Sequence, residues 1–78
     1  MSETNEIISV WTVYDHPKDF PLHYVARRHD VQHGELRVST YFVASFSLRM
    51  LRNHLESLGL HCIPRQEDDD PLVVEMWI

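Results

Sequence analysis

Cysteine and glycine are both scarce in this chain, with one cysteine and two glycines among 78 residues. The single Cys62 cannot form an intramolecular disulfide. Gly34 and Gly59 stand apart, and neither a nucleophile elbow nor a Gly-rich oxyanion loop accompanies the serines, histidines and acids of the sequence. These absences argue against the common forms of nucleophilic catalysis. We therefore predict that the chain is not an enzyme, with no catalytic residue to assign.

Positive charge is also sparse, since seven Lys and Arg stand against twelve Asp and Glu, for a formal net charge of -5. The longest basic run is Arg27-Arg28, so bulk electrostatics oppose binding to phosphate backbones or anionic membranes. No apolar run approaches the roughly 20 residues that span a bilayer. Residues 1–6 are polar and acidic, unlike the start of a signal peptide. We expect a cytoplasmic protein that uses no membrane.

The overall balance of the chain is that of a globular domain, with 44% hydrophobic and 24% charged residues. The pattern predicts a polar tail at 1–6 and a single α+β domain at 7–78. A chain of this length buries only about 60 to 65% of its unfolded surface, so its stability margin is small and a partner would add to it.

Runs of β-branched and aromatic residues with period-two alternation indicate strands. The predicted strands lie at 7–15, 23–31, 36–44 and 72–78. The first carries apolar groups on both faces, which indicates a central strand. Pro17 and Pro21 predict a loop after it, because they fix φ and remove two hydrogen-bond donors. Gly34 marks a hairpin turn between the second and third strands, and a short extended piece is also expected at 61–63.

A helix is predicted after Ser45 or Ser47, either of which can cap its first turn. Its apolar stripe has the spacing i, i+3, i+7 and i+10. The stripe consists of Leu48, Leu51, Leu55 and Leu58. Arg52 and Glu56 are expected to pair on the outer face, and Gly59 followed by Leu60 predicts a Schellman stop in which Leu60 folds back onto Leu55.

These elements predict a two-layer sandwich of order β-β-β-α-β, with a four-stranded, mainly antiparallel sheet and one helix on one face. The helix is expected to meet the aliphatic faces of the last two strands, formed by Leu36, Val38, Thr40, Phe42 and Ala44 and by Leu72, Val74, Met76 and Ile78. The other sheet face would then stay uncovered and carry aromatic and charged groups. The partner-binding residues predicted there are Trp11, Tyr41, Trp77, Arg37 and Glu75, with Tyr14 as an alternative to Trp11.

Histidine is plentiful, with six in the chain, and His29 and His33 have H-x-x-x-H spacing. No C-x-x-C or second H-x-x-x-H completes a tetrahedral set, so we predict no metal site and no cofactor. Asp15, His16 and Asp19 have the residue types of a general-base pair, but hydrogen bonding within a proline-braced turn is the favoured interpretation. Cys62 is interpreted as a small buried hydrophobe rather than a nucleophile.

Two strings of the sequence carry a resemblance. The first comprises Trp11-Thr12-Val13-Tyr14, His16-Pro17, Asp19, Pro21 and Tyr24-Val25-Ala26-Arg27. The second comprises Pro64-Arg65, Asp69-Asp70-Pro71, Glu75 and Trp77. Both resemble the corresponding halves of a group of short, uncharacterised bacterial proteins. The resemblance implies a compact domain and carries over no activity and no site.

The function predicted from these features is a small, non-catalytic protein-interaction module. It would act as a homodimer or as an accessory subunit, through the uncovered aromatic sheet face. The alternative is single-stranded nucleic-acid binding on the same face, suggested by Arg27-Arg28 beside Tyr24. The net charge opposes this alternative, and the two arginines of one strand point to opposite faces.

Overall fold

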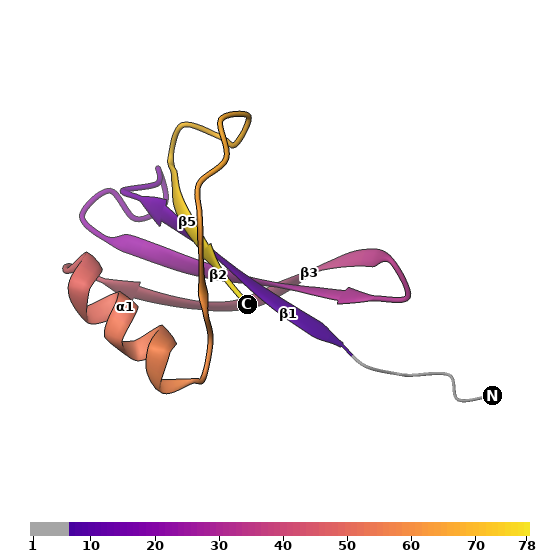
Figure 1. Cartoon of the computed structure of the whole chain (residues 1–78). Coiled ribbons are helices and arrows are strands. Elements are labelled where there is room, and N and C mark those ends of the chain that lie inside the picture. Colours follow the sequence, from indigo (N-terminus) through magenta and orange to yellow (C-terminus); the bar gives the residue numbers. More distant parts are fainter. Residues whose placement is uncertain (1–6) are drawn as a thin grey trace.

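The structure, a computed structural model, describes residues 7–78, with Val38 described by its backbone alone, so the predicted tail at 1–6 lies outside the described residues. The described chain forms a five-stranded antiparallel sheet and one helix (Figure 1). The elements are β1 (Ile8–Asp15), β2 (Tyr24–Gln32), β3 (Glu35–Ser45), α1 (Leu48–Ser57), β4 (Cys62–Pro64) and β5 (Val73–Trp77). The α+β class is confirmed, but the sheet has more strands than the four predicted, because the short extended piece near residue 62 pairs with β5 as an edge strand.

β1 lies at the centre of the sheet, in the strand order β3-β2-β1-β5-β4. Its apolar residues on both faces predicted this central position. The register pairs Trp11 with Arg28 of β2 on one side and with Trp77 of β5 on the other. Directly paired side chains share a face of the sheet, so the two indoles are neighbours.

Local sequence signals set the turn between β2 and β3 and both ends of α1. His33 and Gly34 adopt φ of 52° and 74°, the positive values that a type I′ hairpin turn needs. Ser47 caps α1 by accepting a hydrogen bond from the Met50 amide at 3.3 Å. At the other end, the Gly59 amide donates to the Glu56 carbonyl at 2.9 Å and the Leu60 amide donates to the Leu55 carbonyl at 3.4 Å. This is the predicted Schellman stop.

The core lies between α1 and one face of the sheet (Figure 1). Its buried members are Trp11, Val13, Ala26, Leu51, Leu55 and Trp77. Leu55 is fully buried and Leu48 and Leu60 pack against this cluster, as the helix stripe predicts. Leu58, the last residue of the predicted stripe, is 51% exposed because the helix has already ended at Ser57.

The predicted facing of β5 and β3 is wrong. Val73, Glu75 and Trp77 are the buried residues of β5, whereas Leu72 and Ile78 are exposed. On β3, Val43 packs against the core, whereas Leu36 and Phe42 are exposed. The helix therefore covers the face that was expected to be free.

The physical reason lies in the size of the indoles. Both faces of the alternating strands carry apolar groups, so period two alone does not decide which one the helix covers. Each Trp buries about 150 to 250 Å², more than a Leu or Val side chain, and burial stabilises by about 25 cal/mol per Å². Covering the face with paired Trp11 and Trp77 therefore removes more apolar surface from water than covering the aliphatic face.

Candidate functional site

The sheet has a second face that α1 leaves uncovered, and strand register determines which side chains lie on it. Val10 of β1 pairs with His29 of β2, and Val31 of β2 pairs with Leu36 of β3. Since paired residues point to the same side, these four share the face opposite the tryptophans. We call this surface the helix-free face. It comprises Ile8, Val10, Thr12, Arg27, His29, Val31, Leu36, Phe42 and Met76.

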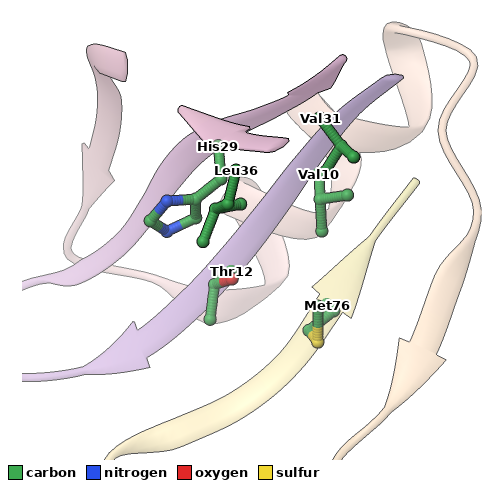
Figure 2. A pocket seen from close by; sticks show the side chains of 6 residues that line it. All are labelled: Val10, Thr12, His29, Val31, Leu36 and Met76. Carbon is green, nitrogen blue, oxygen red and sulfur yellow. The ribbon is translucent and has the colours of Figure 1, made fainter. Parts of the chain in front are cut away.

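A pocket of about 330 Å³ lies in the helix-free face (Figure 2). Side chains from β1, β2, β3 and β5 line it, namely Val10, Thr12, His29, Val31, Leu36 and Met76. The lining is mostly aliphatic. Thr12 and His29 supply its polar atoms, and within residues 7–78 the His29 Nδ1 is the one buried side-chain nitrogen or oxygen without a hydrogen-bond partner. The pocket therefore presents apolar surface with little fixed polarity.

The described strands place no carboxylate on the helix-free face. The carboxylates of the described strands are Asp15, Asp30, Glu35 and Glu75. By register, all four lie on the same side of the sheet as α1. Arg27 is the one Lys or Arg that the described strands place on the helix-free face, and its guanidinium forms an ion pair with Asp19 of the preceding loop. The face is thus close to neutral in a chain of formal charge -5.

Aromatic residues close one end of the helix-free face. Phe20, from the loop at 16–23, lies against Phe42 with ring centroids 5.1 Å apart. The Arg27 guanidinium lies 5.8 Å from the Phe42 ring centre. His23 of the same loop lies 4.2 Å from the ring of Phe46. The proline-braced loop therefore covers this end, and the pocket at the other end remains open.

Three of the five predicted partner-binding residues are in the core rather than on a free surface. Trp11, Trp77 and Glu75 are 5%, 3% and 4% exposed, beneath α1. Tyr41 is exposed and packs edge-to-face on Trp11, with ring centroids 5.7 Å apart. Arg37 is exposed and paired in register with Asp30. The predicted set therefore does not form one uncovered surface.

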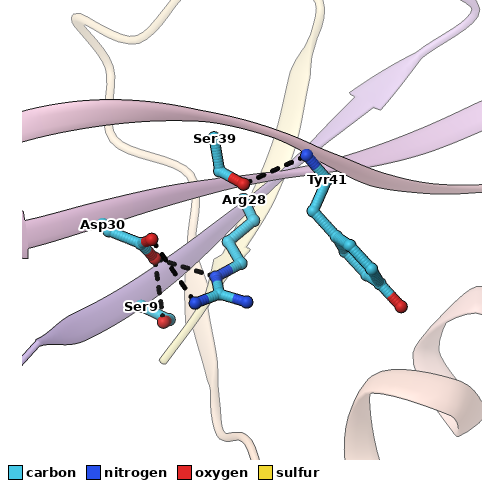
Figure 3. Close-up of polar contacts among 5 residues, drawn as sticks. All are labelled: Ser9, Arg28, Asp30, Ser39 and Tyr41. Atoms are coloured by element: carbon cyan, nitrogen blue, oxygen red, sulfur yellow. Dashed lines mark hydrogen bonds and ion pairs between the residues drawn. The ribbon is translucent and has the colours of Figure 1, made fainter.

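Polar side chains around Tyr41 lie where β2 and β3 lose their regular register (Figure 3). Asp30 accepts hydrogen bonds from the Ser9 hydroxyl at 3.0 Å and from the Arg28 Nε at 2.8 Å. The bond from Arg28 lowers the pKa of Asp30 despite some desolvation. The Ser39 hydroxyl accepts from the Tyr41 amide at 3.0 Å, which satisfies that amide within its own strand. The Ser9 bond to Asp30 thus joins β1 to β2 on the side of the sheet that carries α1, and the Ser39 bond lies within the irregular middle of β3.

Glu75 is a buried charge with three protein partners. The Arg52 Nη2 donates to its carboxylate at 2.6 Å and the Trp77 Nε1 at 2.7 Å. Burial alone raises the pKa of Glu75, but the bonds from Arg52 and Trp77, with a smaller contribution from Cys62, outweigh burial and leave the pKa below its usual value. Arg52, predicted to pair with Glu56, thus ties α1 to β5. An acid flanked by Val74 and Met76 in a strand was the sequence signal for such a buried ion pair.

The Glu75 contacts predict a pH dependence of stability. A carboxyl with a folded pKa below its unfolded value of about 4.5 stabilises the fold above that pH and loses this contribution as pH falls through the folded pKa. The free energy of unfolding from urea titrations should therefore fall below about pH 4.5, and Glu75→Gln should flatten that dependence. Glu56→Gln, at an exposed acid of α1, is the control and should keep the wild-type slope. Parallel curves for wild type and Glu75→Gln would contradict the prediction.

The other candidate residues are dispersed. His29 lines the pocket, whereas His33 lies in the β2–β3 turn. Among the described residues, no three His, Cys, Asp or Glu side chains are grouped in a way that could hold a metal ion. Asp15 contacts His16, while Asp19 contacts Arg27 instead. Cys62, predicted to be buried, is exposed on β4; desolvation and the nearby Glu75 raise the pKa of its thiol, which disfavours the nucleophilic thiolate.

Comparisons with known proteins identified no relative of this chain. The chain matches no protein-family model, no curated protein and no solved structure. Within the described residues, no helix has the length and apolar character to cross a membrane. The geometry of the helix-free face is therefore the basis for a functional proposal.

Proposed function

We propose that this chain is a small, non-catalytic protein-interaction module that docks a protein partner on its helix-free face. The partner is a second copy of the chain or another subunit. The observation that carries the proposal is the open apolar pocket on a sheet face that no helix covers. Antiparallel sheets tolerate water on one face when that face is polar, but here the alternation puts aliphatic side chains there.

Exposure of this aliphatic surface is costly for a domain of this size. Leu36 is 66% exposed and Ile8 is 51% exposed on the helix-free face. Burial of such side chains stabilises by about 25 cal/mol per Å² of apolar area. Contiguous apolar patches on small proteins are typical of interaction surfaces. A protein partner supplies the apolar contacts that the chain lacks on this side.

Single-stranded nucleic-acid binding is the second candidate for the same face. The observation that favours it is Arg27 beside Phe42, a combination that stacks and neutralises single strands elsewhere. Asp19 already pairs with that arginine, however, and the chain carries a net charge of -5. The pocket lining is also mostly aliphatic, with Thr12 and His29 as its polar members, so it offers bases few stacking and hydrogen-bonding groups. We therefore favour the protein partner.

Two methionines provide the test of docking. Met76 lines the pocket, whereas Met50 is 67% exposed on α1. In extract of the native cells, mild peroxide should oxidise Met76 several-fold more slowly than in nanomolar purified protein, with the Met50 rate unchanged. Peptide mass spectrometry of both sites gives the rates. Nuclease treatment should leave the protection in place.

The same measurement has outcomes that contradict the proposal. Equal Met76 oxidation in extract and in dilute buffer would show that nothing occupies the helix-free face. Protection that disappears with nuclease would favour the nucleic-acid alternative. Leu36→Lys should abolish protection, because it places a charge on the pocket rim, whereas Met50→Lys should preserve it.

A further inference from the structure

We infer that the partner is a second copy of this chain, whose helix-free face packs against that of the first around a two-fold axis. This inference rests on the proposed use of the helix-free face for docking. It identifies the occupant and predicts a four-layer assembly with helices outside and two sheets inside. Three properties of the helix-free face support it.

The first property is charge. Two chains of formal charge -5 repel each other unless their acids stay out of the contact. The described strands place Asp15, Asp30, Glu35 and Glu75 on the α1 side, away from the helix-free face. Arg27, which shares that face, is compensated by Asp19 of its own chain. Two copies therefore meet there without like charges in contact, whereas a partner selected by charge would be expected to meet a charged surface.

The second property is area. The sheet has five strands and its central strand has eight residues. At strand spacings of about 4.8 Å and about 3.3 Å per residue, the whole sheet face measures roughly 600 Å². Two copies therefore bury at most about 1,200 Å², because the loop at 16–23 covers one end of the face. This upper limit reaches the lower end of standard, specific interfaces. Sheets that pack face to face lie about 10 Å apart and exclude water between their side chains.

The third property is shape. A two-fold interface uses the same patch on both copies, so one surface must carry both the projecting groups and the hollow that receives them. The helix-free face has both. Leu36 is 66% exposed at the rim of the 330 Å³ pocket that it helps to line (Figure 2). A two-fold rotation can seat each Leu36 in the pocket of the opposite copy.

A pair of matched substitutions tests this assembly in the purified full chain. Leu36→Lys and Met50→Lys each add one positive charge. The two side chains are almost equally exposed, Leu36 at 66% and Met50 at 67%, but Leu36 lies on the helix-free face and Met50 lies on α1. Sedimentation velocity over a concentration series gives the dimer Kd of each. We expect Leu36→Lys to raise the Kd at least about tenfold, because the two-fold axis introduces two lysines into an apolar contact. Met50→Lys should have the wild-type Kd.

Each other outcome overturns the inference. A wild-type chain that stays monomeric at about 100 μM excludes a second copy as the occupant, and so does a dimer that Leu36→Lys leaves intact. Equal weakening by Met50→Lys would place the contact on α1. Near-ultraviolet circular dichroism of the buried indoles checks folding, and Ile8→Lys, on the same face, replaces Leu36→Lys if that variant is unfolded.

The two hypotheses fail separately. If the purified chain is monomeric but Met76 is still protected in cell extract, the second copy is excluded and docking of another subunit stands. If Met76 is unprotected in extract and in concentrated purified protein alike, docking on the helix-free face is itself excluded. Protection of Met76, but not Met50, in concentrated purified protein supports both.

Discussion

Replacing Trp77 with serine should unfold most of the protein at 25 °C. Trp77 is 3% exposed, pairs in register with Trp11 and lies in the cluster that Leu51 and Leu55 cover. Truncating a buried Trp costs about 3 to 5 kcal/mol, a large part of the 5 to 15 kcal/mol that stabilises a typical domain. The variant also loses the indole hydrogen bond to the buried Glu75 carboxylate. Far-ultraviolet circular dichroism in urea should show a midpoint lower by about 3 M, or no folded baseline.

Tyr41→Ser is the matched control, because Tyr41 is an aromatic residue of the same predicted site that is 59% exposed. Its loss removes one edge-to-face contact with Trp11 and should lower the stability by about 1 kcal/mol. A Trp77→Ser protein that stays folded and loses only its partner would contradict the prediction. It would support the interpretation from sequence, in which this side chain points away from the core. Equal effects of the two substitutions would show that burial of Trp77 contributes little.

The features that the sequence predicted well are those determined by residues close together in the chain. Ser47, Gly34 and Gly59 each specify a cap or a turn through their own backbone and side-chain chemistry, and each adopts the expected role. Central placement of β1 followed from apolar residues on both of its faces. Capping and turn geometry involve contacts over four or five residues, so a local pattern is sufficient to define them.

The features that sequence predicted wrongly depend on contacts across the sheet. Trp11 and Trp77 are 66 positions apart. Only their pairing in register places both indoles on one face, where covering them buries more apolar area than covering the aliphatic face would. The sequences of β3 and β5 alternate with a period of two, but this period is the same for both faces of a strand and does not indicate which face the helix covers. One wrong assignment of the face then placed Leu36 and Met76 in the core and Trp77 and Glu75 on the surface.

The wrong assignment of the covered face also changes the residues expected at the candidate site. An uncovered sheet face was predicted because one helix covers one side, and this geometric argument does not depend on which side the helix takes. The residues on the face do depend on it, so an aromatic surface with charges was expected and an aliphatic, nearly neutral one is found. The partner that we propose would therefore meet aliphatic side chains rather than aromatic residues with charged neighbours.

Truncation of Leu55 to alanine should lower the free energy of unfolding by about 2 to 4 kcal/mol. Leu55 is fully buried between Trp11, Trp77 and the Schellman stop, where the Leu60 amide also bonds to the Leu55 carbonyl. Leu58→Ala makes the same chemical change three residues later at a side chain that is 51% exposed, and should stay within about 0.5 kcal/mol of wild type. Urea denaturation of the three proteins gives the comparison. A Leu58→Ala loss as large as that of Leu55→Ala would mean that the helix buries its whole leucine stripe, as the i, i+3, i+7, i+10 spacing alone predicts, and that α1 continues beyond Ser57.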